Sequence, residues 1–149
     1  MAETVPAAQA RQLEAVAMRT WSVALPGLPD WNRYGGNVRH GHYMAEHRAF
    51  KEIKRNIVEL IDVLAKMPEA PFERYSLSYT FRSPGVRTIP RDWDNIMRAT
   101  KPITDALVEL GILRDDSRKY MPRPPELWVE KAGKEEQAQT IIVVQEVTP

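Results

Sequence analysis

The chain has 149 residues, of which 43% are hydrophobic and 28% charged, and its formal net charge at pH 7 is +1. That length suits one soluble globular domain with a core and is too short for two ordinary ones. The absence of cysteine excludes disulfides, zinc–thiolate sites and thiol nucleophiles, and no apolar run approaches the roughly 20 residues that cross a bilayer.

The charge distribution says more about partners than the net value does. Basic side chains outnumber acidic ones between residues 20 and 125, and acidic ones predominate from residue 126 onward. A mildly basic centre is compatible with a face that binds DNA, although charge alone would not suggest one. The N-terminus lacks the cationic start and apolar centre of a secretory signal, so we expect a cytoplasmic protein with no membrane partner.

In the first half of the chain the pattern predicts a strand and a long helix. Residues 1–19 are rich in alanine and are expected to form an N-terminal arm, helical or disordered, ahead of a domain at residues 20–149. Residues 21–25 are typical of a short strand that stops at Pro26. After a polar loop rich in glycine, residues 43–66 have the apolar period of a helix. The apolar stripe of that helix consists of Phe50, Ile53, Ile57, Leu60, Ile61 and Leu64.

The middle of the chain predicts a further strand and a second helix. Residues 75–81 alternate large apolar with hydroxyl side chains, which is typical of a half-buried strand. A helical pattern then begins near Asp94 and ends at Gly111, a residue suited to a left-handed helix stop. Because Pro102 lies inside this pattern, we expect a kink or two abutting helices there.

Two closing strands are predicted near the C-terminus. They cover residues 128–129 and residues 140–144, and the polar residues 131–139 are expected to join them as a mobile hairpin loop. The order strand, helix, strand, helix and hairpin predicts a single α+β domain in which a small mixed sheet packs with two main helices.

Two pairs of acidic residues are the most informative feature of the sequence. Asp92 and Asp94 are two apart, a spacing that puts both carboxylates on one side of an extended segment. The chain then leaves along the second helix and returns through Gly111, which can bring Asp115 and Asp116 back beside them. Gathered carboxylates repel one another unless a cation neutralises them, and Mg²⁺ prefers oxygen ligands. This arrangement predicts a Mg²⁺ site, with Mn²⁺ as a substitute, that is suited to phosphodiester hydrolysis.

A plainer interpretation of the same residues also stands. Asp94 can cap the following helix by accepting a backbone N–H, and Asp115, Asp116 and Ser117 can form a solvated turn. Capping and metal binding are compatible for one residue, so the residues alone leave both interpretations open.

The acidic segments resemble the signature of RusA-type Holliday-junction resolvases, the crossover junction endodeoxyribonucleases, in a phage-like variant. That family has an Asp-x-Asp-Asn element, a helix containing Asp-Ala-Leu, a glycine and then Asp-Asp. The similarity runs from about residue 21 to residue 117, with an upstream Pro and Asn-x-x-Tyr-like opening. The matching residues here are Asp92-Trp93-Asp94-Asn95, Asp105-Ala106-Leu107, Gly111, Asp115-Asp116-Ser117, Pro29 and Asn32-Arg33-Tyr34.

The resemblance implies a Mg²⁺-dependent homodimer that binds branched DNA in recombination and repair. It would nick two opposed strands of a four-way junction and leave a 5′-phosphate and a 3′-hydroxyl. It implies metal-ligand or catalytic roles for Asp92, Asp94 and Asp116, with Asp115 alongside. Two symmetric cuts call for two active sites, which a two-fold dimer supplies.

The sequence departs from the family pattern at three positions. Arg98 stands where the family's core form has a lysine, and an arginine is not a geometric copy of lysine. Lys101 lies in a short insertion and is a second candidate for the catalytic cation. Trp93 replaces the small aliphatic residue that is usual between the two aspartates, and it either packs on the opposite face or alters contact with the junction.

Other side chains are candidates for contact with DNA. Trp31 and Tyr34, in the glycine-rich loop, are the best candidates for stacking on bases, and the histidines are not favoured as metal ligands. The basic residues that we expect to contact the DNA backbone, or else to form ordinary solvated faces, are Arg33, Arg39, Arg48, Lys54, Arg87 and Arg91.

Two alternative functions remain at this stage. A protein of the same fold that has lost catalysis would act as a branched-DNA-binding or interaction module. A flap or branch nuclease would cut without a preference for four arms.

Overall fold

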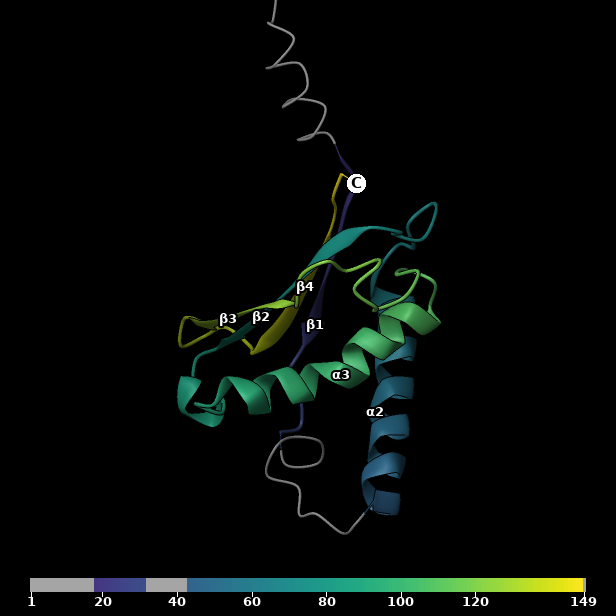
Figure 1. The fold of residues 1–149 in the computed structure, drawn as a ribbon. Helices are drawn as coiled ribbons and strands as arrows, with labels where there is room; N and C mark the ends of the chain where they lie inside the picture. Colours follow the sequence, from purple (N-terminus) through teal and green to yellow (C-terminus); the bar gives the residue numbers. More distant parts are fainter. Residues whose placement is uncertain (1–17, 32–42, 149) are drawn as a thin grey trace, which may run out of the picture.

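The computed structural model describes residues 18–31 and 43–148 of the chain (Figure 1). Its elements in chain order are β1 (Thr20–Pro26), α2 (Tyr43–Leu64), β2 (Tyr75–Ser83), the 3₁₀ helix η1 (Val86–Thr88), α3 (Trp93–Glu109), β3 (Glu126–Lys131) and β4 (Gln139–Glu146). The strands and helices predicted from periodicity are therefore present, within a few residues of the expected bounds.

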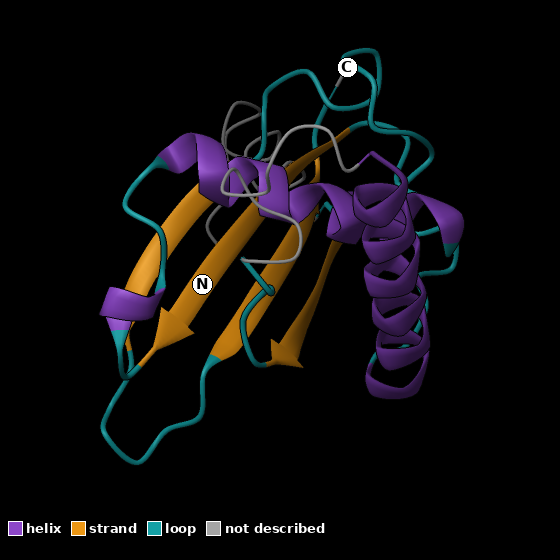
Figure 2. Cartoon of the chain, turned by 90° about the horizontal axis from the view of Figure 1, so that it is seen from below, coloured by secondary structure: helices purple, strands orange, loops and turns teal. Residues whose placement is uncertain are grey.

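The strands form one mixed sheet in the order β1-β4-β2-β3. β4 is antiparallel to both of its neighbours, β1 and β2, while β3 runs parallel to β2 at the edge. Helices α2 and α3 lie on the same face of this sheet, as Figures 1 and 2 show from two directions. The predicted α+β class, with a small mixed sheet and two main helices in one domain, is confirmed.

The core lies between the sheet and the two helices. Along β2, side chains alternate between buried and half-buried, and its buried members face the helices because neighbouring strand residues point to opposite faces. α3 contributes an apolar face that includes Ile96, Ile103 and Leu107. The largest fully buried side chains are Tyr75, Tyr79, Phe72, Phe81, Ile61, Leu77, Ile96, Leu107, Ile112, Leu113, Ile142 and Val144.

The predicted C-terminal hairpin is wrong, because β3 and β4 are not neighbours. β2 lies between them in the sheet, so the connection from β3 to β4 crosses over to a central position. The burial of the two strands explains the order. β4 alternates buried and half-buried positions and is paired on both edges, whereas almost every residue of β3 is exposed, which suits an edge strand.

Of the two alternatives expected at Pro102, a kink or two abutting helices, the second is excluded because Pro102 lies inside the single helix α3. Buried side chains continue on both sides of the proline, among them Ala99 and Ile103. Packing of this apolar face against the core holds the helix together where the proline removes one backbone hydrogen bond.

Candidate acidic site on helix α3

The first acidic pair lies at the N-terminus of α3. Asp92 has an extended backbone and is the N-cap, and its Oδ1 accepts a hydrogen bond from the backbone N–H of Asp94 at 3.0 Å. The capping residue is thus Asp92 and not Asp94. Asp94 lies within the first helical turn and is exposed, where a negative charge is favourable to the helix dipole.

The second acidic pair follows the turn that ends α3. Gly111 has a φ of 78°, in the left-handed region that favours glycine, and the chain then returns so that Leu113 forms a β-bridge with Phe72. The hydroxyl of Tyr75 donates a 2.6 Å hydrogen bond to the backbone carbonyl of Asp115. This bond anchors the acidic turn to the start of β2.

Asp116 forms a salt bridge with Lys101 on α3. The Lys101 Nζ lies 3.1 Å from Asp116 Oδ2 and 3.3 Å from Asp105 Oδ1, so a single ammonium bridges two carboxylates. Partial burial lowers the pKa of Lys101, but the hydrogen bond to Asp116 and the charges of Asp105 and Asp116 outweigh it and leave that pKa raised. The same acidic turn affects Tyr75, because burial and then the charges of Asp116 and Asp115 raise the pKa of its hydroxyl.

Asp105 is a member of this cluster that the sequence candidates did not include. The signal for it was available, because Lys101 and Asp105 are four apart on a helix and such pairs face each other. By the same spacing Asp94, Arg98, Lys101 and Asp105 lie along one side of α3.

The expected gathering of Asp92, Asp94, Asp115 and Asp116 in one metal pocket is not found. Within residues 18–31 and 43–148, no three His, Asp or Glu side chains form a group that could hold a metal ion. The helix rise gives the reason: about 10 Å of axis separate Asp94 from Lys101, where Asp116 is bound, whereas Mg²⁺ takes ligand oxygens at about 2.1 Å. The carboxylate oxygens suit Mg²⁺ chemically, but their placement does not form its cage.

The proposed DNA-binding residues fall into three groups. Arg33 and Arg39 lie outside the described residues. Lys54 is 3.8 Å from Glu109, a contact that joins α2 to α3 and occupies the lysine. The remaining members, Arg48, Arg87 and Arg91, are exposed, as is Arg98, the candidate that replaces the family lysine.

The environments of the aromatic candidates differ from those expected. Trp31 packs edge-on against Phe81, with ring centroids 5.4 Å apart and an interplanar angle of 70°, so it belongs to the core rather than to a base-stacking surface. Tyr34 lies outside the described residues. Trp93, in contrast, is 54% exposed, so more than half of its surface is not packed against the protein.

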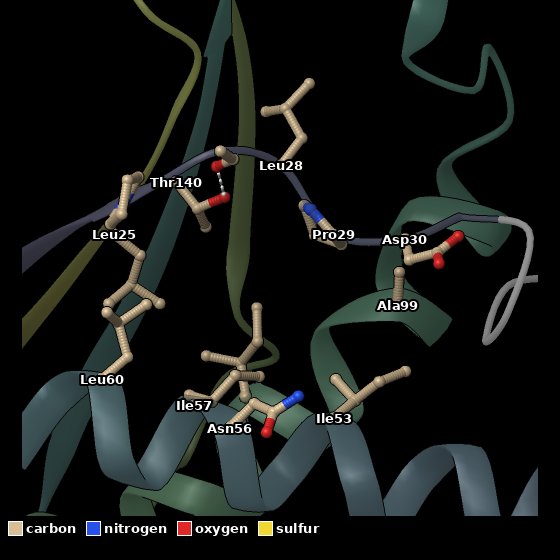
Figure 3. A pocket seen from close by; sticks show the side chains of 13 residues that line it. Leu25, Leu28, Pro29, Asp30, Ile53, Asn56, Ile57, Leu60, Ala99 and Thr140 are labelled. Atoms are coloured by element: carbon tan, nitrogen blue, oxygen red, sulfur yellow. Dashed lines mark hydrogen bonds between the residues drawn. The ribbon is translucent and has the colours of Figure 1, made fainter.

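An apolar pocket of about 250 Å³ lies between the end of β1 and helices α2 and α3 (Figure 3). Its wall includes Leu25, Leu60 and Ile103, and Thr140 Oγ1 donates a 2.9 Å hydrogen bond to the carbonyl of Gly27 beside it. None of the candidate residues predicted from the sequence lines this pocket, so it is separate from the acidic site.

A second cavity, of about 500 Å³, lies at the opposite end of the sheet. Two arginines, Arg74 and Arg123, line it together with Tyr75, the residue that anchors the Asp115 turn. Neither arginine is predicted as a site residue from the sequence, because only the fold brings the two chain segments together.

No protein-family model matches this chain, and no curated protein matches it. Among the described helices, none is long and apolar enough to span a bilayer.

Proposed function

We propose that this protein is a metal-dependent endodeoxyribonuclease that cuts branched DNA, of the RusA-type Holliday-junction resolvase class. The observation that carries the proposal is the bond between Lys101 and Asp116, which spans 15 residues of sequence and brings the second acidic pair onto the helix that starts with the first. The two acidic pairs thus lie along the same helix, and a shared metal site would further require Asp116 to leave Lys101 and approach Asp94.

The proposed cofactor is Mg²⁺, with Mn²⁺ as a substitute, held by Asp92, Asp94 and Asp116 with Asp115 beside them. Binding requires Asp116 to leave Lys101. Because the two side chains are 31% and 54% exposed, their pairing contributes no more than about 1 kcal/mol and opposes that change only weakly. The bound ion would supply a hydroxide and polarise the phosphodiester.

The basic side chains have separate roles in this proposal. Arg98 and Lys101 lie on the acidic side of α3 and would neutralise charge developing on the phosphate. Exposed Arg87 and Arg91, just before the helix, would hold the DNA backbone as it approaches. Paired nicking of a four-way junction needs a second site related by two-fold symmetry, so the proposed active form is a homodimer acting on DNA in the cytoplasm.

The test is a cleavage assay on a synthetic four-way junction with Mg²⁺. We expect paired nicks in opposed strands, and a rate at least about 100-fold lower for Asp94→Asn or Asp116→Asn, a loss of the size seen when one group that stabilises a transition state is removed. Asp62→Asn, an exposed aspartate on α2, is the control and should cut normally. Failure to cut any branched DNA with Mg²⁺ or Mn²⁺ would contradict the nuclease assignment.

A branched-DNA-binding module without catalysis is the second candidate. The placement of the carboxylates favours it, because Asp116 is paired with Lys101 and no group of three acids is formed among the described residues. Tight junction binding with no cutting would support the module. Equal cutting of flaps and four-way junctions would instead indicate a branch nuclease without four-way preference.

A further inference from the structure

The tryptophans of this protein divide by environment. Trp21 is 8% exposed and donates its indole N–H to the carbonyl of Lys66 at 2.8 Å. Trp31 packs on Phe81. Trp93 and Trp128 are 54% and 57% exposed, respectively, the first beginning α3 and the second lying on the edge strand β3.

Folding does not account for a tryptophan at position 93. An apolar side chain stabilises the fold through the surface that it buries, and Trp93 leaves more than half of its surface in water. The core-facing side of α3 is formed instead by residues such as Ile96 and Ala99. In the part of the chain that the structure describes, no hydrogen bond or ring stacking engages the indole, so its face and its N–H are available to a ligand.

Three arginines close to Trp93 in sequence favour a ligand that combines a phosphate with an aromatic ring. The exposed guanidinium groups of Arg87, Arg91 and Arg98 precede and follow it in the chain, and no ion pair occupies any of the three within residues 18–31 and 43–148. Free arginines in the same segment as an exposed aromatic side chain favour single-stranded nucleic acid as the ligand, because the arginines can bind backbone phosphates and the ring can stack on a base.

We propose that Trp93 stacks on an unpaired nucleobase of branched DNA, next to the phosphate that the proposed metal site at Asp92 and Asp94 would bind. This inference rests on the proposed function and adds to it the group that recognises the branch. Bases inside a duplex have both faces covered by their neighbours, so an exposed indole gains stacking only where a base has lost a neighbour, as at the crossover of an open junction, at a flap or at a bulge. Trp93 therefore distinguishes branched from continuous DNA.

The test measures binding by the full-length protein without divalent ions, so that no strand is cut. The probes are a continuous duplex, the same duplex with one unpaired thymine, and a single-stranded thymidine oligonucleotide. Trp93→Ala should weaken binding of the two probes that carry unpaired bases by about five- to hundredfold, the equivalent of one stacked base. Its affinity for the continuous duplex should not change.

Two variants separate stacking from a general effect. Trp93→Phe keeps an aromatic face and should retain most of the affinity for unpaired bases. Trp128→Ala removes an equally exposed tryptophan from another surface and should bind all three probes normally. The single-stranded probe should also quench the tryptophan fluorescence of the wild type and of Trp128→Ala, and should do so much less in Trp93→Phe.

The outcomes distinguish failure of this inference from failure of the proposed function. If the wild type binds the probes and Trp93→Ala binds unpaired bases equally well, the role of Trp93 is wrong while the nuclease proposal stands. If Trp93→Ala weakens binding of all three probes alike, Trp93 contributes to the surface without recognising the branch, and the inference is overturned. If the wild type binds none of the probes or a four-way junction, both proposals fall together.

Discussion

The ammonium of Lys101 lies within 3.3 Å of carboxylate oxygens from both Asp105 and Asp116. In this arrangement it neutralises the same side chain that the proposed metal ion would need. Lysine and metal therefore compete for Asp116, and this competition can be measured residue by residue.

Lys101→Met should tighten the binding of Mg²⁺. The expected gain is up to about fivefold in affinity, since an exposed ion pair contributes no more than about 1 kcal/mol. Titration calorimetry of the full chain with Mg²⁺ measures it. Arg98→Met is the matched variant, and it should be affected less because Arg98 forms no ion pair within the described residues. An affinity that is unchanged or weaker in Lys101→Met would mean that the metal does not use Asp116.

At the scale of the element, α3 determines how far apart the two acidic pairs lie. The helix begins after the Asp92 cap and ends before Gly111. Its buried apolar residues continue on both sides of Pro102 and hold it against the core. The length of this helix is the reason that Asp94 and Asp116 do not meet in the structure, although both lie on its exposed side.

Two substitutions at Asp92 separate its structural role from its proposed role as a metal ligand. Asp92→Ala should lower the free energy of unfolding by about 1 kcal/mol, because it removes the cap, and should also abolish cleavage. Asp92→Asn can still accept the hydrogen bond from the Asp94 N–H, so it should preserve stability and lose only cleavage. Urea denaturation and the junction assay measure the two effects. If Asp92→Asn cleaves normally, Asp92 acts as a helix cap and not as a metal ligand.

At the scale of the whole molecule, one face of the sheet packs against both helices, and this packing buries two tyrosines that respond to high pH, Tyr75 and Tyr79. Burial is the main reason that the pKa values of Tyr75 and Tyr79 are raised above the ordinary 10.0, and the hydrogen bond between Tyr79 and Thr104 only partly offsets it for Tyr79. The pKa of Lys101 is raised above 10.5 as well.

These raised pKa values predict that the protein loses stability above about pH 10. In the unfolded chain the tyrosines release their protons near 10.0, whereas the folded protein retains them, so rising pH favours unfolding. Below that pH these groups have no effect on the pH dependence of stability. Urea denaturation as a function of pH measures the effect. In Tyr75→Phe the alkaline decline should be shallower, and the same slope in both proteins would contradict the assignment to Tyr75.

The sequence by itself determined the kinds of element, their approximate bounds and the α+β class. Periods of apolar residues in 43–66, 75–81 and the α3 region are local properties, and local backbone geometry converts them directly into helices and strands. The stop at Gly111 was equally legible, because caps depend on residues close in sequence, whereas the cap at the other end is Asp92 and not the expected Asp94.

Only the tertiary structure decided the strand order, the partner of Asp116 and the environments of the tryptophans. β4 entered the centre of the sheet and β3 its edge, Trp31 was buried against Phe81, and Trp93 was left in water. Each of these depends on contacts between segments far apart in the chain, which no local period encodes. The spacing of the aspartates along the sequence could not show whether their carboxylates meet, because that distance is set by the length of α3 and by how the following turn packs against Tyr75.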